Sequence, residues 1–368
     1  MVSSFDTVVI GGGAVGAACA WELASTGRKV LIVEQGGHTG QAWRAAAGML
    51  APQIETGAGD PLLGLGLEGR DHYADLAATL QETVGIDLGL WQEGIARVAR
   101  TEAERDQLRG QVAWQQEQGL NCEWLAKDEV RHRWPWLAPT EGALRAPDDG
   151  ALDPERLIEG LLAGAESLGA SAASDKALAV LGSAGRVEGV RGKAGSYFAA
   201  EVVVAGGAWS GLLEGLPRGL PVRPVRGQMA ALPWPHDIPR AIIYHKDSYI
   251  LARRGEAVIG STMEEAGFHP EVTTSGVAQI FSATMSLCPN LLRAKVRRTW
   301  AGLRPMTPDG LPIIGPEPQM KGLWYATGHG RNGILLAGIT GVLLRQLMDG
   351  LQPACDMRAF AAERFRPR

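Results

Sequence analysis

The sequence has few cysteines, and none is placed for a disulfide framework or a metal site. The four cysteines among the 368 residues are Cys19, Cys122, Cys288 and Cys355; they form no C-x-x-C pair and have no histidine beside them at ligand spacing. We therefore expect free thiols in a reducing cytosol and no bound metal. A small domain held together by disulfides is excluded.

Basic charge and long apolar runs are also lacking. The chain has 36 Lys and Arg against 40 Asp and Glu, a net charge of -4, so it offers no positive field for nucleic acid. The apolar run from Ile334 to Leu344 has 11 residues, fewer than the roughly 18 needed to span a bilayer. These features predict a soluble, cytoplasmic protein with no membrane span and with a small molecule as its partner. They leave the oligomeric state open, a homo-oligomer included.

Glycine, in contrast, is abundant, with 49 residues that gather in a few loops. The first loop follows Thr7–Ile10, a β-branched run that predicts a buried parallel strand. Gly11, Gly13 and Gly16 then have G-x-G-x-x-G spacing. In a dinucleotide site such glycines permit a tight turn, the approach of a pyrophosphate to the backbone, and close packing of helix on strand.

The residues after this loop complete a β-α-β unit. Helix formers occupy 17–25, and the apolar strand predicted at 29–33 ends at Glu34, 23 residues after Gly11. A carboxylate there can accept hydrogen bonds from a ribose diol and disfavours a 2′-phosphate such as that of NADP. The unit alone leaves NAD and FAD open. The small-residue stretch at 36–52, where an NAD domain would continue into a crossover helix, favours a flat ligand such as FAD.

Two further loops point to the same ligand. The strand predicted at 201–205 runs into Gly206 and Gly207, a turn beside which a bulky cofactor can pass. Near the carboxyl end, the strand at 323–327 leads through the loop 328–333 into an apolar helix that ends near Met348. A polar, glycine-rich loop at a helix amino end is an anion or carbonyl site. Arg304 and Arg331 are the cations expected at this site, because a guanidinium can bind a carboxylate in a bidentate fork.

Taken together, these motifs resemble the D-amino-acid-oxidase superfamily of FAD enzymes, and within it the glycine oxidases of thiamine biosynthesis. The resemblance rests on segments 9–34, 45–50, 207–210, 300–305 and 328–335, which span nearly the whole chain. It implies that Arg304 binds the substrate carboxylate, that Tyr249 closes on it, that Arg331 lines the site and that Met263 forms a pocket wall. The residues for which it implies FAD contact are Ala14, Val15, Glu34, Gln35, Ala47, Gly48, Met49, Leu178, His329, Gly330, Arg331, Asn332, Gly333, Ile334 and Leu335.

This sequence departs from the family pattern at two places. Ala42, Trp43 and Arg44 stand where relatives place hydroxyl side chains that contact the cofactor, and we expect Arg44 to pair with the pyrophosphate instead. The flavin-linking cysteine of sarcosine-oxidase relatives is also absent from the segment around Arg304. The resemblance therefore implies noncovalent FAD.

The motif positions predict two discontinuous domains. Residues 1–85, 145–220 and 300–368 are expected to form a Rossmann-type α/β FAD-binding domain, and 86–144 and 221–299 an α+β substrate lobe with an antiparallel sheet. The closely spaced prolines between 221 and 228 predict a crossing between the lobes at which no strand continues.

The resemblance implies an enzyme that oxidises glycine, sarcosine or D-amino acids. A hydride passes to flavin, molecular oxygen is reduced to hydrogen peroxide, and the imine gives a keto acid and ammonia or enters thiazole synthesis. Two alternatives stay open. One is a dehydrogenase of D-amino acids, proline or sarcosine with another electron acceptor, and the other is a catalytically silent flavin-binding subunit.

Overall fold

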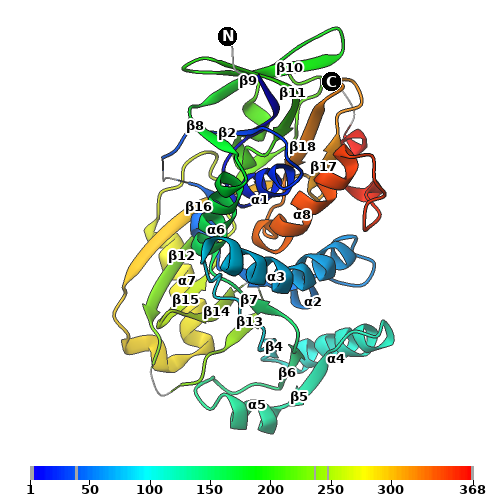
Figure 1. Cartoon of the computed structure of the whole chain (residues 1–368). Helices are drawn as coiled ribbons and strands as arrows, with labels where there is room; N and C mark the ends of the chain where they lie inside the picture. Colours follow the sequence, from blue (N-terminus) through cyan, green and yellow to red (C-terminus); the bar gives the residue numbers. More distant parts are fainter. Residues whose placement is uncertain (1–3, 38–39, 236–237, 247, 366–368) are drawn as a thin grey trace.

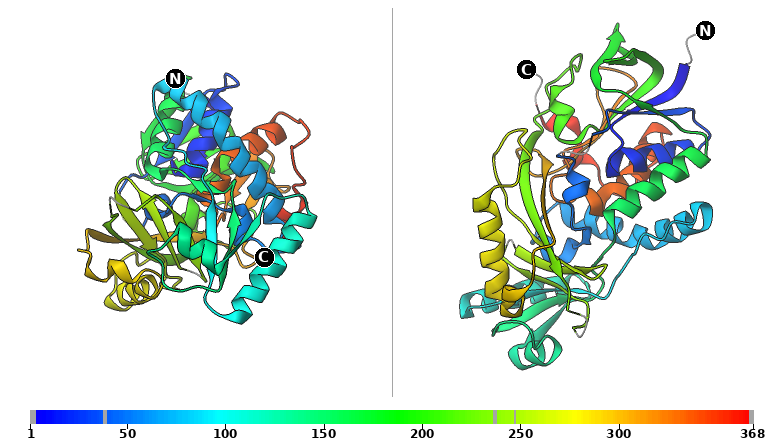
Figure 2. Two further views of the ribbon diagram at one scale, coloured as in Figure 1. Left: turned by 90° about the horizontal axis from the view of Figure 1, so that it is seen from below. Right: turned by 90° about the vertical axis from the view of Figure 1, so that its left-hand side faces the viewer.

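The computed structural model describes residues 4–37, 40–235, 238–246 and 248–365. Two large β-sheets form the frame, with one group of helices between them and a smaller group on the far side of the second sheet (Figures 1 and 2). The first sheet occupies the upper part of Figure 1 and the second its lower left part. The predicted fold class, a Rossmann-type α/β domain with a largely antiparallel second sheet, is confirmed.

The first sheet has a parallel centre assembled from distant segments. β1 (Ser4–Ile10) lies between β2 (Val30–Glu34) and β11 (Ser196–Val204), and all three run parallel. Because side chains alternate along a strand, Val9 packs in the core that contains α1, whereas Val8 and Ile10 face the opposite core. The other strands of this sheet are β8 (Ser171–Ser174), β9 (Ala177–Ser183), β10 (Arg186–Gly192), β17 (Ile313–Pro316) and β18 (Leu323–Thr327).

Helices cover the face of the first sheet that is turned toward the second sheet. They are α1 (Ala14–Ala24), α6 (Pro154–Ser167) and α8 (Gly333–Met348), and α3 (Leu62–Val84) packs on α6 and α8 on their side away from the first sheet. α1 begins at Ala14 rather than at the expected residue 17, and it packs on both α6 and α8. Gly341 permits the close approach of α8, because a Cβ there would lie only 2.7 Å from the carbonyl oxygen of Ala18.

The second sheet joins both halves of the chain. Its strands, in spatial order, are β16 (Arg298–Met306), β12 (Arg223–Pro233), β15 (Glu256–Gly260), β14 (Ser248–Arg253), β13 (Ile242–His245), β4 (Ile95–Ala99), β6 (Gly142–Ala146) and β5 (Glu123–Ala126). Neighbours are antiparallel except β13 and β4. α7 (Thr274–Leu287) packs on the face turned away from the first sheet, while α4 (Glu102–Glu117) and α5 (Lys127–Arg133) lie near β5 and β6 (Figure 2). β3 (Met49–Leu50) and β7 (Gly150–Ala151) form a separate short pair.

The expectation that the prolines at 221–228 interrupt any strand is wrong. β12 runs through Pro224, which lies opposite Pro305 of β16. On its other side β12 pairs with β15 only from Met229 onward, so the missing N–H of Pro224 breaks no ladder there. The predicted domain limits at residues 145 and 300 also fall inside β6 and β16 of the second sheet.

Among the residues that the structure describes, no helix is both long and apolar enough to cross a membrane.

Candidate active site

A cavity of about 390 Å³ lies at the carboxyl ends of β1 and β2 and extends to the second sheet. Open α/β sheets bind ligands at this edge, where the loops leave the strands. The lining residues come from both ends of the chain, from Ile10 to Ile334. The first sheet therefore supplies one wall and the second sheet supplies Tyr249 and Arg304 on the other.

The amino-terminal glycines serve the different purposes that their spacing predicts. Gly11 has φ +102°, and a Cβ there would lie 2.5 Å from the carbonyl oxygen of Ala205. At Gly16 a Cβ would lie 2.0 Å from the carbonyl oxygen of Gly11, so this glycine permits α1 to pack on the loop and does not line the cavity. Gly13 does line it, and its nearest neighbour would be Trp43 at 3.6 Å. The loop thus leaves open space beside the unpaired N–H groups of the first turn of α1.

Glu34 lies at the end of β2 and faces the same loop. Its Oε2 accepts a hydrogen bond of 2.8 Å from the backbone N–H of Gly12, and its Oε1 accepts one of 3.1 Å from that of Gly36. Both contacts fix the carboxylate at the cavity wall. It retains acceptor capacity for the hydroxyls of a ligand.

Arg304 is the cation at the other end of the cavity. Its guanidinium donates to the carbonyl oxygen of Thr262 at 3.0 Å and to Oγ of Ser261 at 2.8 Å. Within the described part of the chain, no carboxylate lies at ion-pair distance from it. Burial lowers the pKa of Arg304, but an arginine remains charged throughout the physiological range. Gly227 makes room for this side chain, since a Cβ there would lie 2.0 Å from Nη1 of Arg304.

Arg331 is already paired. Its Nη2 donates to Oε1 of Glu55 at 3.2 Å, and the hydroxyl of Tyr244 donates to the same oxygen. Glu55, Tyr244 and Arg331 all line the cavity. The two arginines at this end of the cavity therefore differ, because Arg331 has a carboxylate partner among the described residues and Arg304 has none.

Tyr249 and His329, which also lie at this end of the cavity, each keep a single protonation state near neutral pH. Burial raises the pKa of Tyr249 to about 12, so its hydroxyl is a hydrogen-bond donor, which in this structure points at Sδ of Met229 at 3.1 Å. Burial lowers the pKa of His329 to about 3, and its neutral ring contacts Oγ1 of Thr340 at 3.0 Å. Neither group is poised to exchange a proton near neutral pH.

Most of the residues singled out from the sequence line this cavity. They are Gly11, Gly13, Ala14, Val15, Glu34, Gln35, Ala42, Trp43, Ala47, Gly48, Met49, Leu178, Gly206, Gly207, Tyr249, Arg304, His329, Gly330, Arg331, Asn332, Gly333 and Ile334.

Four others lie elsewhere. The first is Gly16, described above. The second is Met263, a residue that is 47% exposed and is not part of the cavity lining, although it was expected to form a pocket wall. Leu335 is buried in the core against α3, because it follows the cavity-facing turn of α8. Arg44 is stacked 4.2 Å above the Trp43 ring, donates to Gln41 and is not among the residues that line the cavity.

Several lining residues had no recognisable pattern in the sequence. At the Arg304 end these are Glu55, Tyr244, Ser261 and Gly227. Glu55 ends the short helix α2 (Pro52–Glu55), directly after the small-residue stretch at 36–52. This position is the one feature of the sequence that could have indicated a place for Glu55 in the site. Lys176, Arg191 and Glu214 line the cavity near Leu178.

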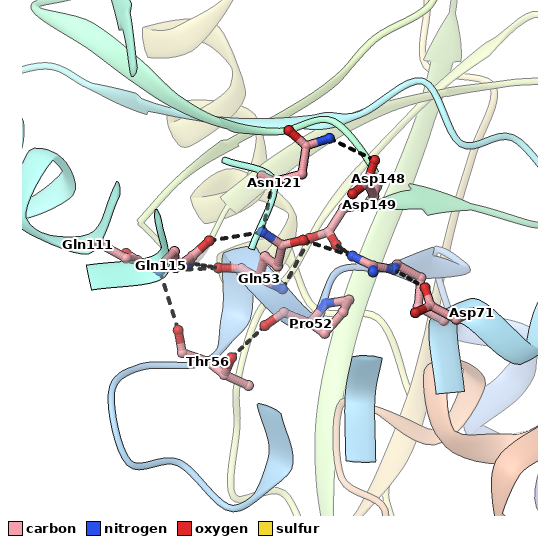
Figure 3. Close-up of polar contacts among 10 residues, drawn as sticks. Pro52, Gln53, Thr56, Asp71, Gln111, Gln115, Asn121, Asp148 and Asp149 are labelled. Carbon is pink, nitrogen blue, oxygen red and sulfur yellow. Dashed lines mark hydrogen bonds and ion pairs between the residues drawn. The ribbon is translucent and has the colours of Figure 1, made fainter. Parts of the chain in front are cut away.

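A buried polar network holds α2 in place (Figure 3). The side chain of Gln53 donates to Gln115 and to the carbonyl oxygen of Asn121, both at 3.0 Å. Arg70 donates to Gln53 at 2.8 Å and to Asp149 at 3.1 Å, and Asp149 also accepts from the backbone N–H of Gln53. Because α2 is only one turn long, these contacts, and not helix propensity, fix the position of Glu55.

A glycine-lined cleft at the edge of a parallel sheet, facing a half-buried arginine on a second sheet, is typical of oxidoreductases that bind a dinucleotide. The chain belongs to the DAO family of FAD-dependent oxidoreductases, whose family model matches residues 6–347. The predicted resemblance, and with it the prediction of an FAD-dependent oxidase of the glycine oxidase type, is confirmed.

The similarity to individual relatives extends over nearly the whole of this chain. A glycine oxidase of Geobacillus kaustophilus is 34% identical, with 99% of this chain and 98% of the relative covered. The crystal structure of the glycine oxidase from that species superposes with a TM-score of 0.94 over 98% of this chain and 99% of the other. The iminodiacetate oxidase of Chelativorans sp. BNC1 is 28% identical, with a TM-score of 0.89 over 96% and 98% of the two chains. The bifunctional protein ThiO/ThiG of Nostoc is 35% identical over 93% of this chain, which spans 52% of that protein.

The residues that line the cavity fit FAD, the cofactor in the family's description. Gly13 leaves open the side of the loop that a pyrophosphate would occupy, and the Glu34 carboxylate stands where a ribose diol can donate to it. The amino ends of α1 and α8 both meet the cavity, so unpaired backbone N–H groups are available at its two ends.

Proposed function

We propose that the protein oxidises glycine and other small amines, including sarcosine and D-amino acids, and that molecular oxygen is the electron acceptor. The products would be an imine, hydrolysed to a keto acid and ammonia, and hydrogen peroxide. The observation that carries this proposal is Arg304, a half-buried cation on the cavity wall without a carboxylate partner in the described chain. Bound FAD would supply the acceptor of a hydride from the substrate carbon.

The side chains around Arg304 act by binding and orientation. The guanidinium is held by Thr262 and Ser261, so it can meet a substrate carboxylate without reorganising. Tyr249 keeps its proton and can donate to the same carboxylate. Positioning suffices when the substrate amine arrives neutral, which fits the lack of a titrating acid-base pair among Tyr249, His329 and Arg304.

The test is reduction of the yellow holoprotein by substrate without oxygen. Glycine, sarcosine, D-alanine and L-proline are added anaerobically in turn, and loss of the flavin absorbance is recorded. Peroxide formation under air is then compared with reduction of a dye. Bleaching with peroxide supports the oxidase, bleaching with dye reduction alone supports a dehydrogenase, and no bleaching by any amine indicates a flavin-binding subunit and refutes the proposal.

The family relationship also suggests where the product is used. One relative combines ThiO with ThiG in a single chain, which supports a place for this protein in thiazole synthesis for thiamine. The cytoplasmic location predicted above is consistent with this place and remains a prediction.

We further propose that FAD is held noncovalently. Cys19, Cys122, Cys288 and Cys355 all lie outside the cavity lining, so the described chain offers no thiol to the cofactor. Acid precipitation should therefore release all the yellow colour into the supernatant, where its spectrum identifies FAD. Colour that stays in the washed pellet would contradict noncovalent binding.

Gly227→Ala should impair substrate binding without unfolding the protein. The added Cβ would meet the Arg304 guanidinium, which must shift, and a misplacement of about 1 Å can cost roughly a hundredfold in rate. We expect KM for glycine to rise and kcat/KM to fall by about 10- to 100-fold. The matched control is Gly110→Ala, where a Cβ meets open space. Equal kinetics in the two variants would show that Gly227 has no such part.

A further inference from the structure

The substrate end of the cavity carries a defined balance of charge. Arg304 and Arg331 contribute two positive charges, and Glu55 contributes one negative charge. The remainder, one positive charge, is matched by one carboxylate of a bound amino acid. A second carboxylate on the substrate would meet Glu55, and like charges brought together in a poorly solvated site repel strongly.

Glu55 is held firmly where it blocks Arg331. It receives hydrogen bonds from Arg331 and Tyr244, and its side chain is 14% exposed against 37% for Arg331. The Gln53 network fixes α2 from behind. Arg331 therefore presents an occupied guanidinium to the cavity, although its side chain lines the wall.

We propose that Glu55 determines substrate specificity by restricting the site to amines with a single carboxylate. It does so by occupying Arg331, which would otherwise bind the second carboxylate of an N-carboxymethyl amino acid or an aminodicarboxylic acid. This inference rests on the proposed function, in which Arg304 receives the first carboxylate.

Glu55→Gln is the variant that tests the proposal. The amide keeps an acceptor oxygen for Tyr244 and nearly the same volume, but it removes the negative charge and leaves Arg331 unpaired. Ligand binding is measured first, by calorimetric titration of the holoprotein with acetate and with the dicarboxylates malonate, succinate and glutarate. We expect the preference for the best dicarboxylate over acetate to rise at least about tenfold relative to the unsubstituted protein, because a charged partner is gained.

Turnover gives the second readout. Iminodiacetate, the compound in the name of the Chelativorans relative, carries two carboxylates and is compared with sarcosine. In Glu55→Gln the ratio of kcat/KM for iminodiacetate to that for sarcosine should rise by about the same factor, mainly through KM. Adding Arg331→Gln should abolish the gain. Glu256→Gln, which removes a carboxylate paired with Arg298 outside the cavity lining, should leave both ratios unchanged.

Each outcome of these experiments either supports or overturns the proposal. An unchanged dicarboxylate preference in folded, flavin-loaded Glu55→Gln overturns the proposal, as does a gain that persists in the double variant. The titrations need no turnover, so a protein that oxidises no amine refutes the proposed function while the titrations still test the role of Glu55.

Discussion

Replacing Arg304 by alanine is expected to lower kcat/KM for glycine by roughly two to three orders of magnitude while FAD stays bound. The substrate carboxylate would be buried opposite Tyr249 and Ser261 without a charged partner. Truncating one member of a buried charge pair costs about 2–5 kcal/mol, and each 1.4 kcal/mol is about tenfold. Steady-state kinetics and the flavin content of the purified variant check this.

Two further variants test whether the loss of activity is specific to the guanidinium of Arg304. Arg304→Lys keeps the charge but loses the fork and the bonds to Ser261 and Thr262, so it should recover only part of the activity. Arg298→Ala removes an arginine from the same strand, half-exposed and stacked on Trp300 outside the cavity lining, and should change kcat/KM little. Unchanged kinetics in Arg304→Ala would refute its role in substrate binding.

Arg70→Ala should cause the largest loss of folding stability, about 3–5 kcal/mol, in urea unfolding followed by tryptophan fluorescence. Asp149 is fully buried and would lose its cationic partner, which is the usual magnitude for breaking a buried ion pair. Burial raises the pKa of Asp149 from 3.8 to about 7. Because the folded carboxyl binds a proton more tightly than the unfolded one, stability falls as pH rises through this window. The loss in Arg70→Ala should therefore be larger at pH 8 than at pH 5.

The chain offers matched controls for this prediction. Arg131→Ala breaks an exposed pair with Asp128 and should change stability by less than about 1 kcal/mol. Combining Arg70→Met with Asp149→Leu replaces the whole pair by apolar groups and should recover much of the loss. A double variant no more stable than Arg70→Ala would show that the hydrogen bonds to Gln53, and not the unpaired charge, carry the effect.

Local patterns predicted the cofactor end of the cavity well, because its geometry is made within short segments. The spacing of Gly11, Gly13 and Gly16, the strand that ends at Glu34 and the loop before α8 each contain the turn, helix and acceptor in consecutive residues. The structure brings these segments to one cavity. Their contact with FAD remains a prediction.

The substrate end depends on contacts that a single sequence does not reveal. Glu55 is a lone acid on a one-turn helix, and its importance comes from Tyr244 and Arg331, 189 and 276 residues away. Gly227 has no distinguishing pattern in the sequence, and its importance comes from the Arg304 side chain that lies across it. The expected break at Pro224 was wrong for a similar reason, since whether a proline interrupts a strand depends on which neighbours pair with it.

The cavity that reaches from Ile10 to Ile334 has a thermodynamic consequence for the cell. A ligand that needs both sheets and both ends of the chain binds only after they have assembled, so its binding free energy adds to that of folding. At a free concentration 100 times Kd this addition is about 2.7 kcal/mol, a large share of the net stability of a typical domain. The steady-state amount of this protein is therefore expected to follow the supply of its cofactor, so that a riboflavin-starved cell loses the protein to proteolysis as well as its activity.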